Sequence, residues 1–245
     1  MWLLRPIGGM GRKPREQEPG GIYHVYARGN RKALIYLDEM DRDIYLRYLT
    51  RVVERHAWRC LGYCLMPNHV HLLVELGEEA TLAKGMHQLH TNYARYFNAR
   101  HGEPDDGHVF QSRYGSVPIT DDRQLLTVIG YLAVNPVAAG LCAAPEAWPW
   151  SGHRALAGDA SAPAWLDVTR TWRYLNGFGG GDGAEVYRAL IDARLQNVYA
   201  STSARKAARA AGEMNDAVNE LRASVRNAAS SRPRASRTPK RLSSA

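Results

Sequence analysis

The sequence predicts an α+β fold in which a β-α-β-β-α-β series of elements is followed by one further helix. Four short segments are β-prone, two longer segments between them carry apolar residues at helical spacing, and Gly, Pro, Asn and Asp separate them. This order is that of the ferredoxin-like arrangement, a single antiparallel sheet with two helices on one face.

The first strand and the first helix are predicted in residues 20–56. Residues 1–19 are rich in Gly, Pro and charged side chains without periodicity, so we expect a disordered N-terminal segment. Residues 21–27 alternate and are β-prone, and Arg28-Gly29-Asn30 breaks this strand. Asp38 is a suitable N-cap for a helix that extends to about His56.

The other core elements follow the same logic. Residues 58–65 and the strand that begins at His69 predict a hairpin, joined by a turn over residues 66–68. A second helix is predicted over residues 81–100 and a fourth strand over residues 109–119. The last helix begins after Thr120-Asp121-Asp122 and runs through Val134, and Asn135-Pro136 is expected to stop it.

The core domain is expected to span residues 20–155, and the pattern weakens after it. Residues 156–200 predict an accessory helical region, because an apolar stripe runs along residues 184–196 after a glycine-rich junction at 177–183. Residues 201–245 predict a basic, largely disordered tail, with ten Lys and Arg against three acidic residues. This tail carries +7 of the net charge of +8, which is typical either of nonspecific attraction to nucleic-acid phosphates or of a solvated extension.

The overall composition indicates a globular cytoplasmic protein. Apolar residues make up 45% of the chain and charged residues 23%, and 245 residues allow one sizeable domain with extensions or two small domains. Cys60 and Cys64 lie in an apolar strand and are expected in the core, and with Cys142 they fit a reducing compartment. The apolar stretch at the start is too short for a signal peptide, and no apolar run could span a membrane.

The strongest functional signal is the segment that runs from Leu65 to Glu75, which places two histidines at the start of an apolar strand. Side chains alternate across a strand, so His69 and His71 share one face with Leu73 and Glu75. Val70, Leu72, Val74 and Leu76 form the other face, which is expected to pack against helices. Two adjacent imidazoles suit one divalent metal ion, which would need a further protein ligand and water; the alternative is a pair of satisfied core or interface histidines.

The helix over residues 121–134 offers partners for these histidines. Tyr131 and Asn135 are four residues apart and share a helical face. A phenol beside a metal can lose its proton and attack phosphorus, forming a covalent phosphotyrosine, and an amide oxygen could reach the same metal. The alternatives are an aromatic core anchor at Tyr131 and a helix C-cap at Asn135.

These residues carry a resemblance to a known family. Met66-Pro67-Asn68-His69-Val70-His71 resembles the histidine-hydrophobic-histidine (HUH) motif of single-tyrosine transposases, and the chain is similar to the IS200-like REP-associated tyrosine transposases. The similarity extends over residues 20–155 and recurs in order in four further places: Tyr23-His24-Val25 with Arg28-Gly29-Asn30, residues 107–114, residues 131–140 and residues 148–152.

The resemblance implies a nuclease and strand transferase that acts on single-stranded, hairpin-forming DNA with Mg²⁺ or Mn²⁺. It assigns the nucleophile to Tyr131, which would become linked to a 5′ phosphate, and the metal ligands to His69, His71 and Asn135. Glutamine is common at the last position in the wider superfamily, so the ligand at Asn135 is one carbon shorter. A homodimer and a nucleoid-associated location in the cytoplasm are compatible with this family.

Candidate DNA contacts are Arg28, Asn30 and Arg31 after the first strand, and Arg113 with Tyr114 on the fourth strand. Tyr93 and Tyr96 compete with Tyr131 as nucleophiles, but they lack a ligand-type residue four positions later and are interpreted as helix packing. Two other functions remain open: a domesticated protein that binds DNA hairpins without cutting them, and a metallohydrolase that uses water as its nucleophile.

Overall fold

The computed structural model describes residues 17–79, 81–102, 107–179 and 181–203. Contacts divide the chain into two units, Met1–Gln196 and Asn197–Ala245, and every element discussed below except the end of the last helix belongs to the first. The basic tail beyond residue 203 lies outside the described residues, and so does the N-terminal segment before residue 17.

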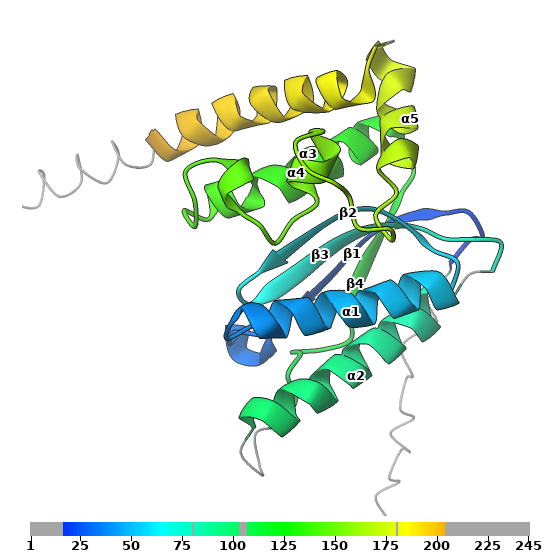
Figure 1. The fold of residues 1–245 in the computed structure, drawn as a ribbon, viewed down its shortest axis with the longest axis vertical. Helices are drawn as coiled ribbons and strands as arrows, with labels where there is room; N and C mark the ends of the chain where they lie inside the picture. Colours follow the sequence, from blue (N-terminus) through cyan, green and yellow to red (C-terminus); the bar gives the residue numbers. More distant parts are fainter. Residues whose placement is uncertain (1–16, 80, 103–106, 180, 204–245) are drawn as a thin grey trace, which may run out of the picture. The chain divides into compact units, whose positions relative to one another are not determined.

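A four-stranded antiparallel sheet forms the centre of the molecule (Figure 1). It contains β1 (Ile22–Arg28), β2 (Arg59–Met66), β3 (His69–Glu75) and β4 (Gly115–Ile119), in the spatial order β2-β3-β1-β4. The predicted α+β class and the β-α-β-β-α-β order are confirmed. The histidine strand therefore lies in the interior of the sheet, paired with β2 on one side and β1 on the other.

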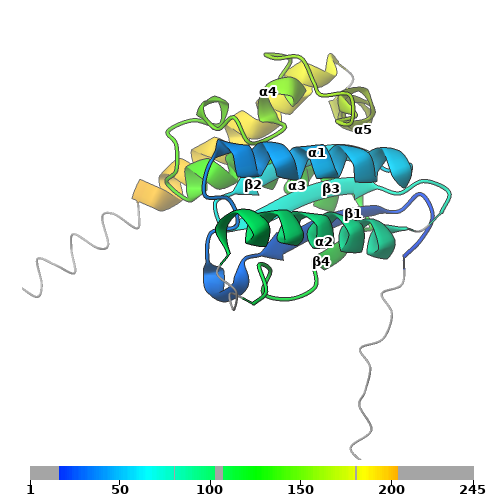
Figure 2. The same ribbon diagram turned by 60° about the horizontal axis from the view of Figure 1, so that its bottom comes forward.

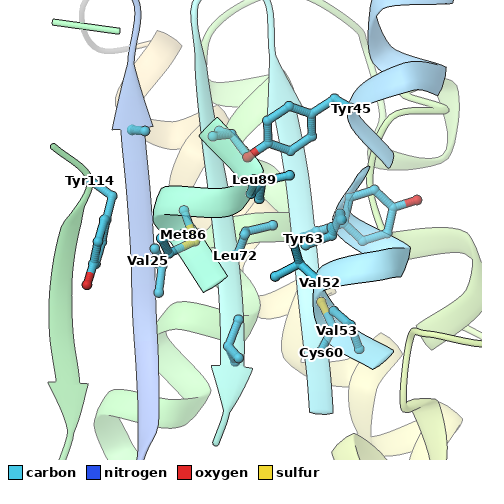
Figure 3. Packing of buried hydrophobic residues seen from close by; sticks show 14 of the residues in the cluster. Val25, Tyr45, Val52, Val53, Cys60, Tyr63, Leu72, Met86, Leu89 and Tyr114 are labelled. Atoms are coloured by element: carbon cyan, nitrogen blue, oxygen red, sulfur yellow. The ribbon is translucent and has the colours of Figure 1, made fainter. Parts of the chain in front are cut away.

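Two helices, α1 (Glu39–Arg55) and α2 (Leu82–His101), cover one face of this sheet (Figure 2). Asp38 caps α1, since its side chain accepts a hydrogen bond from the Asp41 amide. The apolar face of β3 packs against these helices as predicted, because Val70, Leu72 and Val74 belong to the same buried cluster as residues of α1 and α2. Figure 3 shows Val25 and Leu72 of the sheet facing Val52, Met86 and Leu89 of the helices.

The opposite face is covered by α3 (Asp122–Ala138), with α4 (His153–Leu156) and α5 (Val168–Gly179) beside it (Figure 1). A further helix runs over residues 183–203. α5 lies within residues 156–200, where an accessory helical region is predicted, and it contains the first of the glycines that were predicted as a flexible junction. No helix within the described part of the chain is both long enough and apolar enough to cross a membrane.

The prediction that α3 stops at Asn135-Pro136 is wrong, because the helix continues to Ala138. Pro136 is accommodated inside a buried last turn, although it cannot donate a backbone hydrogen bond. The helix ends at Ala138, just before Gly140, whose φ of +72° lies in the left-handed region, and the Leu141 amide donates to the Pro136 carbonyl oxygen at 2.9 Å. Asn135 is therefore an interior helical residue and not a C-cap.

The fourth strand is shorter than predicted, because residues 109–114 form a loop and only a single bridge joins Gly29 to Phe110. Phe110 turns inward and stacks on His90, with ring centroids 4.1 Å apart. Backbone bonds then tie the loop to the end of β1, since the Gln111 amide donates to the Arg28 carbonyl at 2.9 Å. The loop therefore lies beside the end of β1 and does not extend β4.

Two buried carboxylates accept charged hydrogen bonds that join elements of this fold. Asp41 is fully buried and is bound by Arg100 at 2.6 Å and His101 at 2.9 Å, which joins the start of α1 to the end of α2. Glu75, at the end of β3, accepts two hydrogen bonds from Arg170 of α5, at 2.8 and 2.9 Å. Charged hydrogen bonds therefore join the two helices on one face to each other, and they join α5 on the other face to the sheet.

Candidate active site

Polar side chains from β1 and β3 gather on the face of the sheet that α3 covers. His69 and His71 of β3 point to this face, and the antiparallel register pairs them with Arg28 and Tyr26 of β1. His24 lies two residues earlier on β1, on the same face. The alternate residues of both strands belong to the apolar core. Period-two alternation thus concentrates the polar groups on one face of two neighbouring strands.

The turn before β3 orients His69. Nδ2 of Asn68 donates to the carbonyl oxygen of Lys32 at 3.1 Å, and Oδ1 of the same amide lies 2.7 Å from Nδ1 of His69. Because an amide oxygen only accepts, Nδ1 of His69 carries the proton and Nε2 keeps its lone pair. This tautomer follows from the hydrogen-bond network.

Helix α3 brings Tyr131 to the same place. The Tyr131 hydroxyl lies 3.3 Å from Nε2 of His71, and the two rings meet edge to face with centroids 5.1 Å apart. Tyr131 is 40% exposed, so it is not an aromatic core anchor. By contrast, Tyr93 is fully buried and its hydroxyl donates to the Ile35 carbonyl oxygen, while the Tyr96 hydroxyl donates to Asp41 at 3.1 Å. Both of these tyrosines are packing residues, as predicted.

Asn135 lies one helical turn after Tyr131, with its side chain buried at 8% exposure. Its Nδ2 atom has no hydrogen-bond partner among the described residues. Rotating the amide by half a turn would place Oδ1 there instead, and that oxygen could accept a cation. Burial raises the pKa of Tyr131.

The imidazoles of the site are neutral near pH 7. Burial, together with the neighbouring His24 and His69, lowers the pKa of His71 to about 3. Burial also lowers the pKa values of His24 and His69, and the charge of Arg28 contributes to the effect on His69. Neutral imidazole is the form that can coordinate a metal ion.

A groove of about 490 Å³ opens over these residues. The polar side chains that reach it come from β1, β3, α3 and the loop before β4: Tyr26, Arg28, His69, His71, Gln111, Ser112, Arg113 and Tyr131. Arg28 and Arg113 are both exposed at its edge. The groove therefore combines a phenol and two neutral imidazoles with two positive charges, a set that suits a phosphate-bearing ligand.

The segment that carries these residues matches a known protein family. Residues 20–135 match the family described as "Transposase IS200 like". This segment is an IS200-like transposase domain. It contains every residue of the groove, from Tyr26 to Tyr131.

The domain also has more narrowly defined relatives. The chain is 24% identical over 160 residues to a Haemophilus influenzae protein described as a REP-associated tyrosine transposase, with 62% of this chain and 90% of that protein covered. A solved structure of a REP-associated tyrosine transposase bound to a REP hairpin is similar in fold, with a TM-score of 0.52 and 17% identity. The matched region covers 64% of this chain and 91% of the chain in that structure. At this identity the structural likeness supports the fold alone.

The residues of the IS200-like domain could bind a divalent cation only if ligands from outside the protein complete its coordination. Among the described residues, no three histidine, cysteine, aspartate or glutamate side chains form a ready metal site. His69 and His71 supply two neutral nitrogen donors, and Asn135 has an amide with an unpartnered polar atom. This donor set leaves coordination positions for water and phosphate oxygens, the ligands that Mg²⁺ and Mn²⁺ favour.

The predicted DNA contacts do not all lie at the groove. Arg28 and Arg113 line it, but Asn30 and Arg31 belong to the short 3-10 turn after β1, outside its lining. Tyr114 was predicted to contact DNA, but its ring is only 6% exposed and belongs to the core cluster, and its hydroxyl accepts a hydrogen bond from Gln17 at 3.2 Å. Tyr114 therefore does not line the groove.

Sequence reasoning missed several members of the site, namely His24, Tyr26, Gln111 and Ser112. A signal was present for the first two, because His24, Tyr26 and Arg28 alternate with the apolar residues Tyr23, Val25 and Ala27. Pairing this strand with the histidine strand would have placed its polar face beside His71. The two loop residues carry no such pattern.

Proposed function

We propose that this IS200-like transposase domain is a metal-dependent endonuclease and strand transferase for single-stranded DNA. The observation that carries the proposal is the 3.3 Å approach of the Tyr131 hydroxyl to Nε2 of His71, across two elements that are far apart in the chain. A phenol at a pair of neutral imidazoles, facing a groove with two arginines, is suited to nucleophilic attack on a phosphodiester.

The reaction would proceed in two steps. The Tyr131 oxygen attacks phosphorus, a bond forms between Tyr131 and the 5′ phosphate, and the bond to the 3′ oxygen breaks, so that this oxygen takes up a proton and leaves as a 3′ hydroxyl. In the second step a 3′ hydroxyl attacks the phosphotyrosine and restores both a phosphodiester and the free phenol. The phosphodiester energy is conserved throughout, and no nucleotide cofactor is required.

The protein's own residues supply positioning and charge. His69, His71 and Asn135 would hold Mg²⁺ or Mn²⁺, which when bound supplies positive charge for the scissile phosphate and for the phenolate. Arg28 and Arg113 would neutralise the neighbouring DNA phosphates. Because burial raises the pKa of Tyr131 when no ion is present, the free protein keeps its phenol protonated until a metal and a substrate are both in place.

We further propose a hairpin-forming strand as the substrate, because one structural relative is bound to a REP hairpin. Arg31, which has a positive φ of 51°, and Asn30 lie just after Arg28 in the chain and would contact DNA beyond the groove. The basic tail of residues 201–245 would add nonspecific affinity. A homodimer remains compatible with this function, which would operate at the nucleoid in the cytoplasm.

The decisive experiment incubates the full chain with a 3′-labelled single-stranded hairpin oligonucleotide and MnCl₂, followed by a denaturing gel. We expect a covalent protein–DNA adduct that is absent in Tyr131→Phe and in His71→Ala. Tyr48→Phe, a change on α1 at the opposite face of the sheet, is the matched control and should leave the adduct unchanged.

Two alternative functions give different results in the same experiment. A protein that only binds hairpins would shift the oligonucleotide on a native gel without any adduct. A metallohydrolase that uses water would still cleave the strand after Tyr131→Phe, and it would never become linked to DNA. Either result would overturn the proposal and support the corresponding alternative function.

A further inference from the structure

His24 makes a direct contact with one of the two histidines of the groove. Its Nε2 atom lies 3.0 Å from Nδ1 of His71, and the two rings are nearly parallel, with an interplanar angle of 28°. His24 pairs with Leu73 in the sheet, so its contact with His71 is a diagonal one between neighbouring strands. The contact engages the ring nitrogen of His71 that does not face Tyr131.

This contact has two tautomeric forms with opposite consequences. If His24 donates to His71, Nδ1 of His71 accepts and Nε2 must carry the proton, which prevents Nε2 from binding a cation. If His71 donates instead, Nδ1 carries the proton, and the lone pair of Nε2 points towards the groove and Tyr131. Only the second form provides a metal ligand on the side where the nucleophile lies.

His69 already has the corresponding tautomer, with its proton on Nδ1 and the lone pair on Nε2. Oδ1 of Asn68 accepts the Nδ1 proton of His69, because Nδ2 of the same amide is committed to the Lys32 carbonyl. Histidines that bind metals commonly donate their other ring N–H to an acceptor, which fixes the tautomer and the ring orientation. Each of the two groove histidines therefore has one partner at Nδ1, Asn68 for His69 and His24 for His71.

We propose that His24 is a positioning residue that accepts the Nδ1 proton of His71 and thereby keeps Nε2 of His71 available to the divalent cation. This inference rests on the proposed metal-dependent function, in which His71 is a ligand. His24 itself does not bind the ion in this scheme. Its ring also meets the ring of Tyr131 edge to face, at 6.1 Å between centroids, so it holds the ligand beside the nucleophile.

The inference can be tested by metal binding rather than by catalysis. Free Mn²⁺ is measured by electron paramagnetic resonance during titration of the full chain, as wild type and as the variants His24→Leu, His24→Gln and His71→Ala. Leucine fills space without accepting a proton, whereas the end of a glutamine side chain can reach a position close to Nε2 of histidine and accept. His87→Leu, on the exposed side of α2, is the matched control.

We expect His24→Leu to weaken Mn²⁺ binding by about 10- to 100-fold, in line with the loss of a partner behind a metal-binding histidine. His24→Gln should recover most of that affinity, and His87→Leu should not change it. Leucine and glutamine variants that bind Mn²⁺ with equal affinity would overturn the inference, as would wild-type affinity in His24→Leu.

A second measurement covers the case in which His24→Leu fails to fold. Nitrogen-15 NMR of the histidine-labelled wild type, with Mg²⁺ added, reports which ring nitrogen of His71 carries the proton. A proton on Nδ1 supports the inference, and a proton on Nε2 overturns it. If His71→Ala retains full Mn²⁺ affinity, the metal ligand in the proposed function is wrong. If His71→Ala loses it while His24→Leu does not, the function stands and only the role of His24 fails.

Discussion

The hydroxyl of Tyr131 and Nε2 of His71 lie 3.3 Å apart, although 60 positions separate the two residues in the chain. The contact joins a helix on one face of the sheet to an interior strand, so it depends on the whole packing of α3 against β2 and β3. Tyr131 is 40% exposed and His71 is 7% exposed, so the contact lies at the boundary between the groove and the protein interior.

The amide of Asn135 should matter for metal binding far more than for folding. Because Nδ2 has no partner within the described residues, Asn135→Leu should change the free energy of unfolding by no more than about 1 kcal/mol, measured by urea denaturation. The same variant should bind Mn²⁺ more weakly, and Asn135→Asp should bind it more tightly because a carboxylate replaces a neutral oxygen. Unchanged Mn²⁺ affinity in both variants would contradict a ligand at this position.

The arginines of the groove should contribute to DNA affinity through charge. Replacing Arg28 or Arg113 by alanine should weaken binding of a single-stranded hairpin and should reduce the slope of log affinity against log salt by about one for each phosphate that is no longer neutralised. Fluorescence anisotropy over a range of NaCl concentrations measures both quantities. Arg47→Ala, on the exposed side of α1, is the matched control, and an equal effect there would argue against a specific role for the groove.

Asp41 should be a major contributor to stability. Asp41→Asn removes the charge that Arg100 and His101 bind, and breaking a buried ion pair of this kind costs about 3 kcal/mol. Urea denaturation measures the loss, with the neighbouring exposed Asp43→Asn as control. A loss no larger than that of Asp43→Asn would show that this carboxylate is not needed to join α1 to α2.

The pKa of Asp41 also sets a pH dependence. Burial alone would raise this pKa, but hydrogen bonds from His101, the Leu37 amide and Arg100 outweigh burial and lower it. The unfolded chain therefore takes up the proton first as the pH falls below about 4, so the contribution of Asp41 is present at neutral pH and is lost on acidification. Asp41→Asn should flatten the stability curve in that acidic range.

His90 should cause a loss of stability at a higher pH. Burial against Phe110 lowers the pKa of His90 to about 3, so the folded protein keeps this ring neutral while the unfolded chain protonates it near its ordinary value. Stability therefore falls as the pH drops below about 6.5, by up to about 2 kcal/mol at pH 5 from this residue. His90→Phe should remove this part of the loss between pH 7 and pH 5, whereas the exposed His87→Phe should not.

Local patterns in the sequence predicted the element order and the two faces of the histidine strand. Alternation of side chains fixes which residues share a face, and the buried cluster around Val70, Leu72 and Val74 confirms it. The same logic did not reveal His24, because its importance depends on the register between β1 and β3, which no single strand encodes. The proximity of Tyr131 to His71 came from family resemblance, since helix packing is likewise a long-range property.

The wrong predictions also have physical causes. Pro136 is a local stop signal, but burial of the last turn of α3 and the left-handed Gly140 move the end of the helix to Ala138. Tyr114 was placed near DNA because its sequence lies beside Arg113, yet the loop turns just before β4 and directs the ring into the core. α5 lies within the predicted accessory helical region, but its end at Gly179 extends into the glycine-rich segment that was predicted as a flexible junction.

The pair formed by Glu75 and Arg170 bears on how small a working fragment can be. The family match ends at residue 135, but the carboxylate that ends the histidine strand is only 6% exposed and takes its hydrogen bonds from α5. Cutting the chain after α3 would leave a negative charge in the interior without its counter-ion, at the far end of the strand that holds both imidazoles. Expression trials should therefore keep residues up to at least Tyr174, whose hydroxyl also donates to Glu75 at 3.0 Å.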